Sequence, residues 1–171
     1  MNKTLHALSQ QCGALLLQHH WKVSTAESCT GGWISHCITA VAGSSDWFEM
    51  GFVTYSNAAK QRLLNVPDTY FEPQAPGAVS EETVLAMAAG ALHTSGAQFA
   101  IATSGIAGPG GGSADKPVGT VWVGWVWQLP GAPLRSLARA HGFAGDREAV
   151  RRQTVQTALE GLLEVLQKTA V

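Results

Sequence analysis

The spacing of apolar and polar residues along the chain predicts an alternation of helices and strands. Between residues 2 and 19, leucines and one cysteine recur at the intervals of an amphipathic helix. Residues 21–27 have the pattern of a short strand, and residues 30–41 return to helical spacing. Residues 48–56 are rich in the aromatic and β-branched residues that strands prefer. The first third of the chain is therefore expected to form helix, strand, helix and strand in that order.

The same alternation continues toward the C-terminus. A short helix is expected from Ser56 to Leu64, followed by a loop with prolines and a helix over residues 80–94. Three more strands and a last helix follow, at residues 97–105, 119–127 and 134–143 and from about Asp146. The strand at 119–127 is apolar on both faces, so we expect a central strand covered on both sides. The pattern predicts an α/β fold, a single-domain layered sandwich over residues 1–171 with a mixed sheet flanked by helices.

Composition and charge exclude several classes of protein. Apolar residues make up 46% of the chain and charged residues 13%, which is typical of a globular protein and not of a disordered one. The net charge is -1, so no broad basic field is expected to attract nucleic acid. The apolar runs are shorter than a membrane span, and the N-terminal segment lacks a signal-peptide cleavage site. We therefore expect a cytoplasmic protein with neither a nucleic-acid nor a membrane partner.

The cysteines and histidines show no metal-binding spacing. Cys12, Cys29 and Cys37 are odd in number and include no CxxC pair, so we expect reduced thiols. The six histidines include no HExxH motif. The sequence predicts no metal site.

A candidate nucleophile lies in the stretch AESCTGG, residues 26–32. Ser28 is expected at a strand-to-helix turn, where backbone N–H groups are unpaired and could bind an oxyanion. Glycines at positions 31 and 32 would let a substrate approach the backbone. Two alternatives stay open at this point: Ser28 or Thr30 simply caps the helix, or the neighbouring Cys29 is the nucleophile. We expect the Cys29 side chain to point into the core.

Lys60 is the candidate general base for that serine. A lysine in the first turns of a helix, and partly buried, has a lowered pKa and can accept a proton from a hydroxyl. Tyr55, at the end of the preceding strand, could hold or relay this proton. The alternative is an ordinary exposed surface lysine.

Two further features could bind an anion. Residues 104–119 form a long glycine-rich loop, in which Ser104, Lys116 and the backbone of residues 110–112 could contact a phosphate, although a plain connection is an equal alternative. Arg147 and Arg151 lie one turn apart at the start of the last helix. Either a substrate phosphate or a nearby carboxylate would balance their charge.

Together these segments resemble the CinA C-terminal domain family, whose stand-alone members are nicotinamide-nucleotide amidases. The resemblance is carried by AESCTGG (26–32), AGSSDWFEMGFVTYSNAAK (42–60), GAVSEETVLAMAAG (77–90), SGIAGPGGGSADKPVGTVW (104–122) and GDREAVRRQTVQTAL (145–159). It implies hydrolysis of the carboxamide of nicotinamide mononucleotide to nicotinic acid mononucleotide and ammonia, without metal or cofactor.

The resemblance also implies a role for each matching residue. Ser28 is the nucleophile, Lys60 the general base and Tyr55 a neighbour that orients or relays. The amides of the expected helix start would bind the oxyanion; they belong to Thr30, Gly31 and Gly32. The nucleotide would be held by Ser104, Gly105, Gly110, Gly111 and Arg147. A homodimer is the expected assembly.

The chain departs from the family pattern at two places. The motif YSNEAK is YSNAAK here, so Ala58 replaces a carboxylate that could tune Lys60. The large N-terminal domain of longer CinA proteins is absent, so activities located there are not expected. Two other functions stay open on the sequence: a non-catalytic nucleotide-binding module, and an amidase for a related carboxamide.

Overall fold

A computed structural model describes residues 2–170 of the chain and contains one mixed five-stranded sheet. The strands, in the spatial order β2-β1-β3-β4-β5, are β1 Val23–Glu27, β2 Phe48–Val53, β3 Phe99–Gly105, β4 Thr120–Trp127 and β5 Arg135–Gly142. The α-helices are α1 Lys3–Gln18, α2 Trp33–Thr39, α3 Asn57–Leu64, α4 Glu81–Ser95 and α5 Arg147–Thr169. Two short 3₁₀ turns cover Ser44–Asp46 and Asp68–Phe71.

The strand directions bring several chain segments to one edge of the sheet. β1 runs parallel to both β2 and β3, with Glu27 opposite Val53 on one side and Thr103 on the other. The carboxyl ends of these three strands therefore lie side by side. β4 is antiparallel to β3, and β5 is antiparallel to β4. The β3–β4 loop and the start of α5 consequently lie at this same edge, which is where ligands bind in open α/β sheets.

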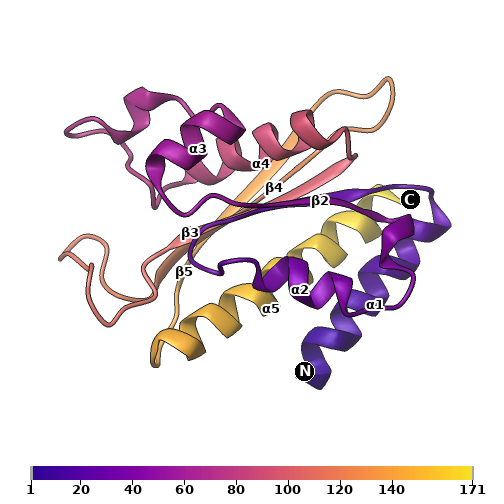
Figure 1. Cartoon of the computed structure of the whole chain (residues 1–171), viewed down its shortest axis with the longest axis horizontal. Coiled ribbons are helices and arrows are strands. Elements are labelled where there is room, and N and C mark those ends of the chain that lie inside the picture. Colours follow the sequence, from indigo (N-terminus) through magenta and orange to yellow (C-terminus); the bar gives the residue numbers. More distant parts are fainter. Residues whose placement is uncertain (1, 171) are drawn as a thin grey trace.

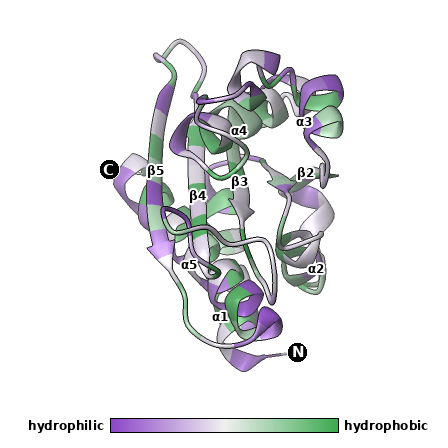
Figure 2. Ribbon diagram, turned by 90° about the vertical axis from the view of Figure 1, so that its left-hand side faces the viewer, coloured by the Kyte–Doolittle hydropathy of each residue, from purple (hydrophilic) through white to green (hydrophobic). Residues whose placement is uncertain are grey.

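Two helical layers cover the two faces of the sheet. Helices α1, α2 and α5 lie on one face, and α3 and α4 lie on the other (Figure 1). Each layer has its own core: Ile101 and Trp125 belong to the first, and Ala102 and Val126 to the second. In Figure 2, hydrophilic stretches appear along β5, at the outer edge of the sheet. The α/β sandwich with a mixed sheet that the alternation predicted is confirmed.

The elements differ from the predicted ones where backbone geometry intervenes. The second helix begins at Trp33 and not at residue 30, because Gly31 and Gly32 adopt φ angles of +61° and +92°, which belong to the left-handed region. β2 ends at Val53, since the segment that follows turns so that Ser56 can cap α3. β4 is covered on both faces as expected, but β3 is the middle strand.

The length and apolar character of the helices bear on whether any of them could span a membrane. Within residues 2–170, no helix combines the length and the apolar character that crossing a bilayer requires.

Candidate active site

The predicted nucleophile and base are in direct contact. Ser28 directly follows β1, is 8% exposed, and donates its backbone N–H to the carbonyl of Thr103 at 3.0 Å. Ala26 points into the core beneath α4, and because side chains alternate along a strand, Ser28 faces the same side. There its Oγ accepts a hydrogen bond of 3.0 Å from Lys60 Nζ. Two side chains separated by 32 positions thus meet at the carboxyl ends of parallel strands.

Helix α3 carries Lys60 into this contact. The Ser56 side chain caps α3, so the helix starts immediately after β2 and Lys60 lies in its first turns. Nζ donates to three acceptors: Ser28 Oγ, the Thr54 carbonyl at 2.9 Å and the Tyr55 carbonyl at 3.2 Å. The residue is 1% exposed, so it is not the surface lysine of the alternative interpretation.

Burial changes the protonation of this lysine. Desolvation lowers the pKa of Lys60 from 10.5 to about 8, because an ammonium loses hydration inside the protein. When the amine is neutral, the two backbone carbonyls still accept its two N–H groups. The remaining lone pair then points toward the Ser28 hydroxyl, which is the arrangement that general-base catalysis requires.

The neighbouring thiol is not equipped to compete. Cys29 is 5% exposed and belongs to the core on the α5 side of the sheet, as expected from the sequence. Burial raises the pKa of its thiol to about 11, whereas a reactive cysteine needs a thiolate. Ser28 is therefore the better nucleophile of the two.

The start of α2 is occupied by a carboxylate from the preceding strand. Glu27, fully buried, accepts the backbone N–H groups of Gly32 at 3.1 Å, Ile34 at 2.9 Å and Ser35 at 2.8 Å, and also the Ser35 hydroxyl. The Gly31 N–H donates to the Ser28 carbonyl at 3.0 Å. This differs from the expected oxyanion site, because the amides of Gly31 and Gly32 already have protein acceptors.

Two other amides of this turn have no acceptor. Among residues 2–170, the N–H groups of Cys29 and Thr30 donate to no protein atom. The Thr30 hydroxyl does not cap α2 either, since it bonds to Thr103 Oγ1 at 2.8 Å. The turn directly after Ser28 therefore offers free N–H donors, one residue earlier than the sequence indicated.

The two arginines of α5 make contacts that the sequence did not reveal. Arg147 donates to the Gly108 carbonyl and to the Tyr55 hydroxyl, both at 2.8 Å. The Tyr55 hydroxyl thus contacts Arg147, while only its backbone carbonyl contacts the lysine. Arg151 donates to the carbonyls of Cys29 and Thr30.

Among the residues that the structure describes, no carboxylate neutralises either arginine. Asp146 caps α5 through the Ala149 N–H, and in the part of the chain that the structure describes neither Asp146 nor Glu148 forms an ion pair with an arginine. The charge of Arg147 is therefore available to an anionic ligand at the edge of the site.

The glycine-rich loop begins beside the catalytic pair. Ser104 is buried at the end of β3, and its hydroxyl bonds to no atom of residues 2–170. Gly105 is required by packing, because a Cβ there would lie 2.5 Å from Val121 Cγ2. Gly110 and Gly111 are exposed, and Gly111 has a φ of +90°. The loop therefore combines a structural glycine near the strand with open backbone farther out.

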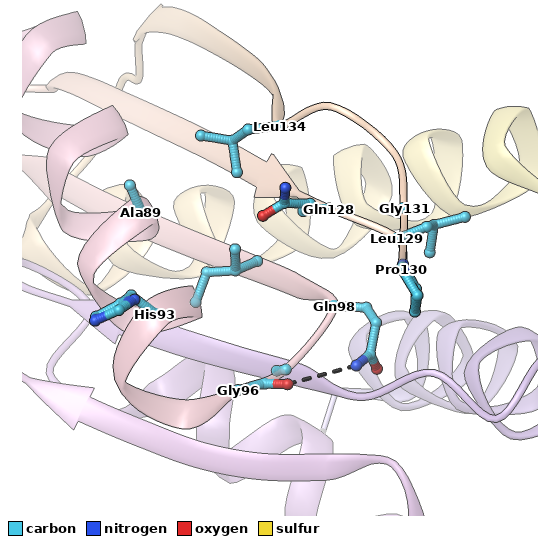
Figure 3. Close-up of a pocket in the computed structure, with 11 residues that line it drawn as sticks. Ala89, His93, Gly96, Gln98, Gln128, Leu129, Pro130, Gly131 and Leu134 are labelled. Carbon is cyan, nitrogen blue, oxygen red and sulfur yellow. Dashed lines mark hydrogen bonds between the residues drawn. The ribbon is translucent and has the colours of Figure 1, made fainter.

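The pocket shown in Figure 3 does not coincide with this chemistry. It has a volume of about 590 Å³ and lies between the C-terminal end of α4 and the β4–β5 loop, with Gln98 and Gln128 facing it. That is the end of the sheet opposite the carboxyl ends of β1, β2 and β3. The site around Ser28 is identified by its polar contacts and not by its depth.

Comparisons with known proteins agree with the sequence segments. The family model of the CinA C-terminal domain matches residues 5–166. The chain belongs to the CinA C-terminal domain family. It is 54% identical to nicotinamide-nucleotide amidohydrolase PncC of Pseudomonas putida, over 92% of this chain and 94% of the relative. It is 49% identical to the protein of that name from Escherichia coli strain K12, over 92% of each chain.

A solved structure of a similar protein has the same fold. The competence/damage inducible protein CihA from Agrobacterium tumefaciens superposes with a TM-score of 0.90 and 41% identity, covering 98% of each chain. The CinA fold of this chain thus extends over nearly its whole length.

The contacts of two residues of this CinA domain, Glu27 and Arg151, were not predicted from the sequence. Glu27 was visible as an acid six positions before α2, but its role depends on the left-handed turn between strand and helix. Arg151 was visible only as a cation on the last helix. Its partners lie 122 and 121 positions away, and no local pattern encodes such a contact.

Proposed function

We propose that this protein is a nicotinamide-nucleotide amidase and that residues 1–171 form a single amidase domain. The reaction converts nicotinamide mononucleotide and water to nicotinic acid mononucleotide and ammonia. The names of relatives that are about half identical support this substrate. The observation that carries the mechanism is the 3.0 Å contact between buried Lys60 Nζ and Ser28 Oγ.

Acylation uses the pair in its neutral form. Lys60 Nζ takes the proton of the Ser28 hydroxyl while Oγ forms a bond to the carboxamide carbon. The C=O electron pair moves to oxygen, and the resulting oxyanion accepts the free N–H groups of Cys29 and Thr30. Removing one such donor from an enzyme typically costs about 10²- to 10³-fold in rate.

The same lysine then serves as an acid and again as a base. The Lys60 ammonium gives its proton to the amide nitrogen, the C–N bond breaks, and ammonia leaves an acyl-Ser28 ester. Lys60 next takes a proton from water as the hydroxide attacks the ester carbon, and returns it to Ser28 Oγ. The acid product is released and both side chains regain their starting protonation.

The nucleotide phosphate is proposed to lie against Arg147 and the glycine-rich loop. Arg147 forms no ion pair with a carboxylate of residues 2–170, and it reaches Gly108 and Tyr55 at the rim of the site. Ser104 and the exposed backbone at Gly110 and Gly111 supply further polar groups. Binding energy from the phosphate then supports reaction at the carboxamide.

Ammonia release from nicotinamide mononucleotide tests the proposal. Wild type, Ser28→Ala and Lys60→Met are assayed with a chelator present, and folding is checked by circular dichroism. We expect wild-type turnover and a loss of at least about 10³-fold in each variant, the scale for removing a nucleophile or its base. Full activity in folded Ser28→Ala would refute the mechanism, and an inactive wild type would refute the substrate.

The assembly and the location of the protein are separate expectations. We keep a homodimer and a cytoplasmic location as predictions, which size-exclusion chromatography with light scattering and cell fractionation test.

A further inference from the structure

We propose that Arg151 is a positioning residue that aims the backbone N–H of Thr30 at the oxyanion. The inference rests on the proposed amidase function and adds to it a component on the last helix. It concerns the geometry of the turn after Ser28 and not contact with the substrate.

The guanidinium of Arg151 holds the carbonyl side of this turn. Its Nε donates to the Cys29 carbonyl at 3.0 Å, and its terminal nitrogen donates to the Thr30 carbonyl at 2.8 Å. The group also lies over the Trp33 ring, 5.3 Å from the ring centroid. Two parallel donors on a rigid plane fix two successive carbonyls, which a lysine could not do in the same way.

Peptide geometry converts this contact into an orientation of the amide. The Cys29 carbonyl and the Thr30 N–H belong to one planar trans peptide, in which C=O and N–H point in opposite directions. Arg151 comes from α5, on the face opposite α3 (Figure 1). With the carbonyl held toward α5, the Thr30 N–H is directed toward the side on which Lys60 contacts Ser28.

Within this turn, the Thr30 N–H is the donor whose direction depends on the contact of Arg151 with the Cys29 carbonyl. The next amides along the chain, at positions 31 and 32, already donate to protein oxygens. The Thr30 side chain is itself anchored by Thr103 Oγ1 at 2.8 Å. A hydrogen bond to the carbonyl of a peptide also polarises its N–H, so Arg151 strengthens the donor as well as orienting it.

A direct role in phosphate binding is the competing explanation for Arg151. The hydrogen bonds of Arg151 go to backbone carbonyls. Arg147, one turn earlier, donates instead to Gly108 and Tyr55 at the rim of the site. Substrate binding and turn geometry affect different kinetic constants, so the two roles can be separated.

Three variants test the proposal: Arg151→Met, Arg151→Lys and, as the matched control, Arg152→Met at the exposed neighbouring position. We expect kcat to fall about 10- to 100-fold in Arg151→Met with little change in KM, a fraction of the loss for deleting an oxyanion donor. Arg151→Lys should regain part of this loss, and Arg152→Met should resemble wild type. Thermal unfolding and circular dichroism establish that each variant is folded.

The thioamide analogue of the substrate provides a readout that general destabilisation does not move. Sulfur accepts N–H groups weakly, so wild type should hydrolyse the amide much faster than the thioamide. If Thr30 is misaligned, the ratio of the two rates should shrink in Arg151→Met and stay unchanged in Arg152→Met. An unchanged ratio in Arg151→Met, or a rise in KM with normal kcat, would overturn the role of Arg151 while leaving the amidase proposal intact. An inactive wild type would instead refute the amidase proposal itself.

Discussion

The strongest quantitative prediction concerns the pH dependence of the reaction. A lysine with its ordinary pKa of 10.5 is neutral in about one molecule in 3,000 at pH 7, whereas a pKa of about 8 makes it neutral in about one in 11. Burial of Lys60 therefore increases the reactive population about 300-fold at pH 7. We expect kcat/KM to rise about tenfold per pH unit below pH 7, to reach half its maximum near pH 8 and to level off above about pH 9.

Initial rates of ammonia release from pH 6.5 to 9.5, at constant ionic strength and with ammonia measured after quenching, test this profile. Lys60→Arg is the control, because a guanidinium stays protonated and its activity should remain negligible throughout. A flat profile between pH 7 and 9, or a rise that continues without a plateau, would contradict a neutral lysine as the base.

The same pKa has a consequence for stability with a defined sign. Because the pKa of Lys60 is lower in the folded chain, the unfolded chain binds more protons between about pH 8 and pH 10.5. The contribution of this residue to the free energy of unfolding therefore increases with pH across that window. Urea unfolding of wild type and Lys60→Met at several pH values isolates this contribution. If the free energy of unfolding of wild type rises with pH no more steeply than that of the variant, the result is inconsistent with the lowered pKa.

Three other predictions follow from contacts described above or from the packing of glycines. Arg147→Ala should raise KM for nicotinamide mononucleotide about 10- to 100-fold, the scale of a lost charged hydrogen bond. The effect on nicotinamide riboside, which has no phosphate, should be much smaller. Equal losses on both substrates would argue against phosphate binding by Arg147. Gly90→Ala would place a Cβ 2.1 Å from the Leu64 carbonyl oxygen, so α3 must move; we expect about 1–3 kcal/mol of destabilisation and reduced activity. Gly142→Ala, where a Cβ meets no atom within 4 Å, is the control for calorimetry, and equal melting temperatures of the two variants would count against this packing. Iodoacetamide at pH 7.5 should leave activity unchanged, because burial raises the pKa of Cys29 to about 11; inactivation with label on Cys29 would show otherwise.

The sequence was informative where local patterns decide the structure. Helix periodicity, strand composition and the Ser56 cap predicted the order of elements, because these signals act over a few residues. Parallel strands then bring the residues after β1 and β2 to one edge, so Ser28 and the start of α3 become neighbours. The residues alone made Lys60 a candidate base, with an ordinary surface lysine as the alternative, and the resemblance to a known family favoured the Ser28–Lys60 pair.

The details of the oxyanion turn could not be read from local patterns. The sequence predicts available amides at the start of the helix, whereas in the structure the Glu27 carboxylate accepts three of the backbone N–H groups there. The positive φ angles of Gly31 and Gly32 delay the helix and so change which amides are free. A carboxylate and a guanidinium can each serve many roles, and only the folded backbone decides which acceptor or donor lies within reach.

The contact between α5 and α1 joins the last helix of the chain to the first. During synthesis, Ser28 and Lys60 leave the ribosome about a hundred residues before α5, at a stage when the apolar side of α1 still lacks its cover. Packing of α5 against α1 completes this helical layer and also brings Arg151 to the turn after Ser28. A variant of this chain truncated before Arg147 would therefore lose both the packing partner of α1 and the Arg151 contacts to the turn after Ser28.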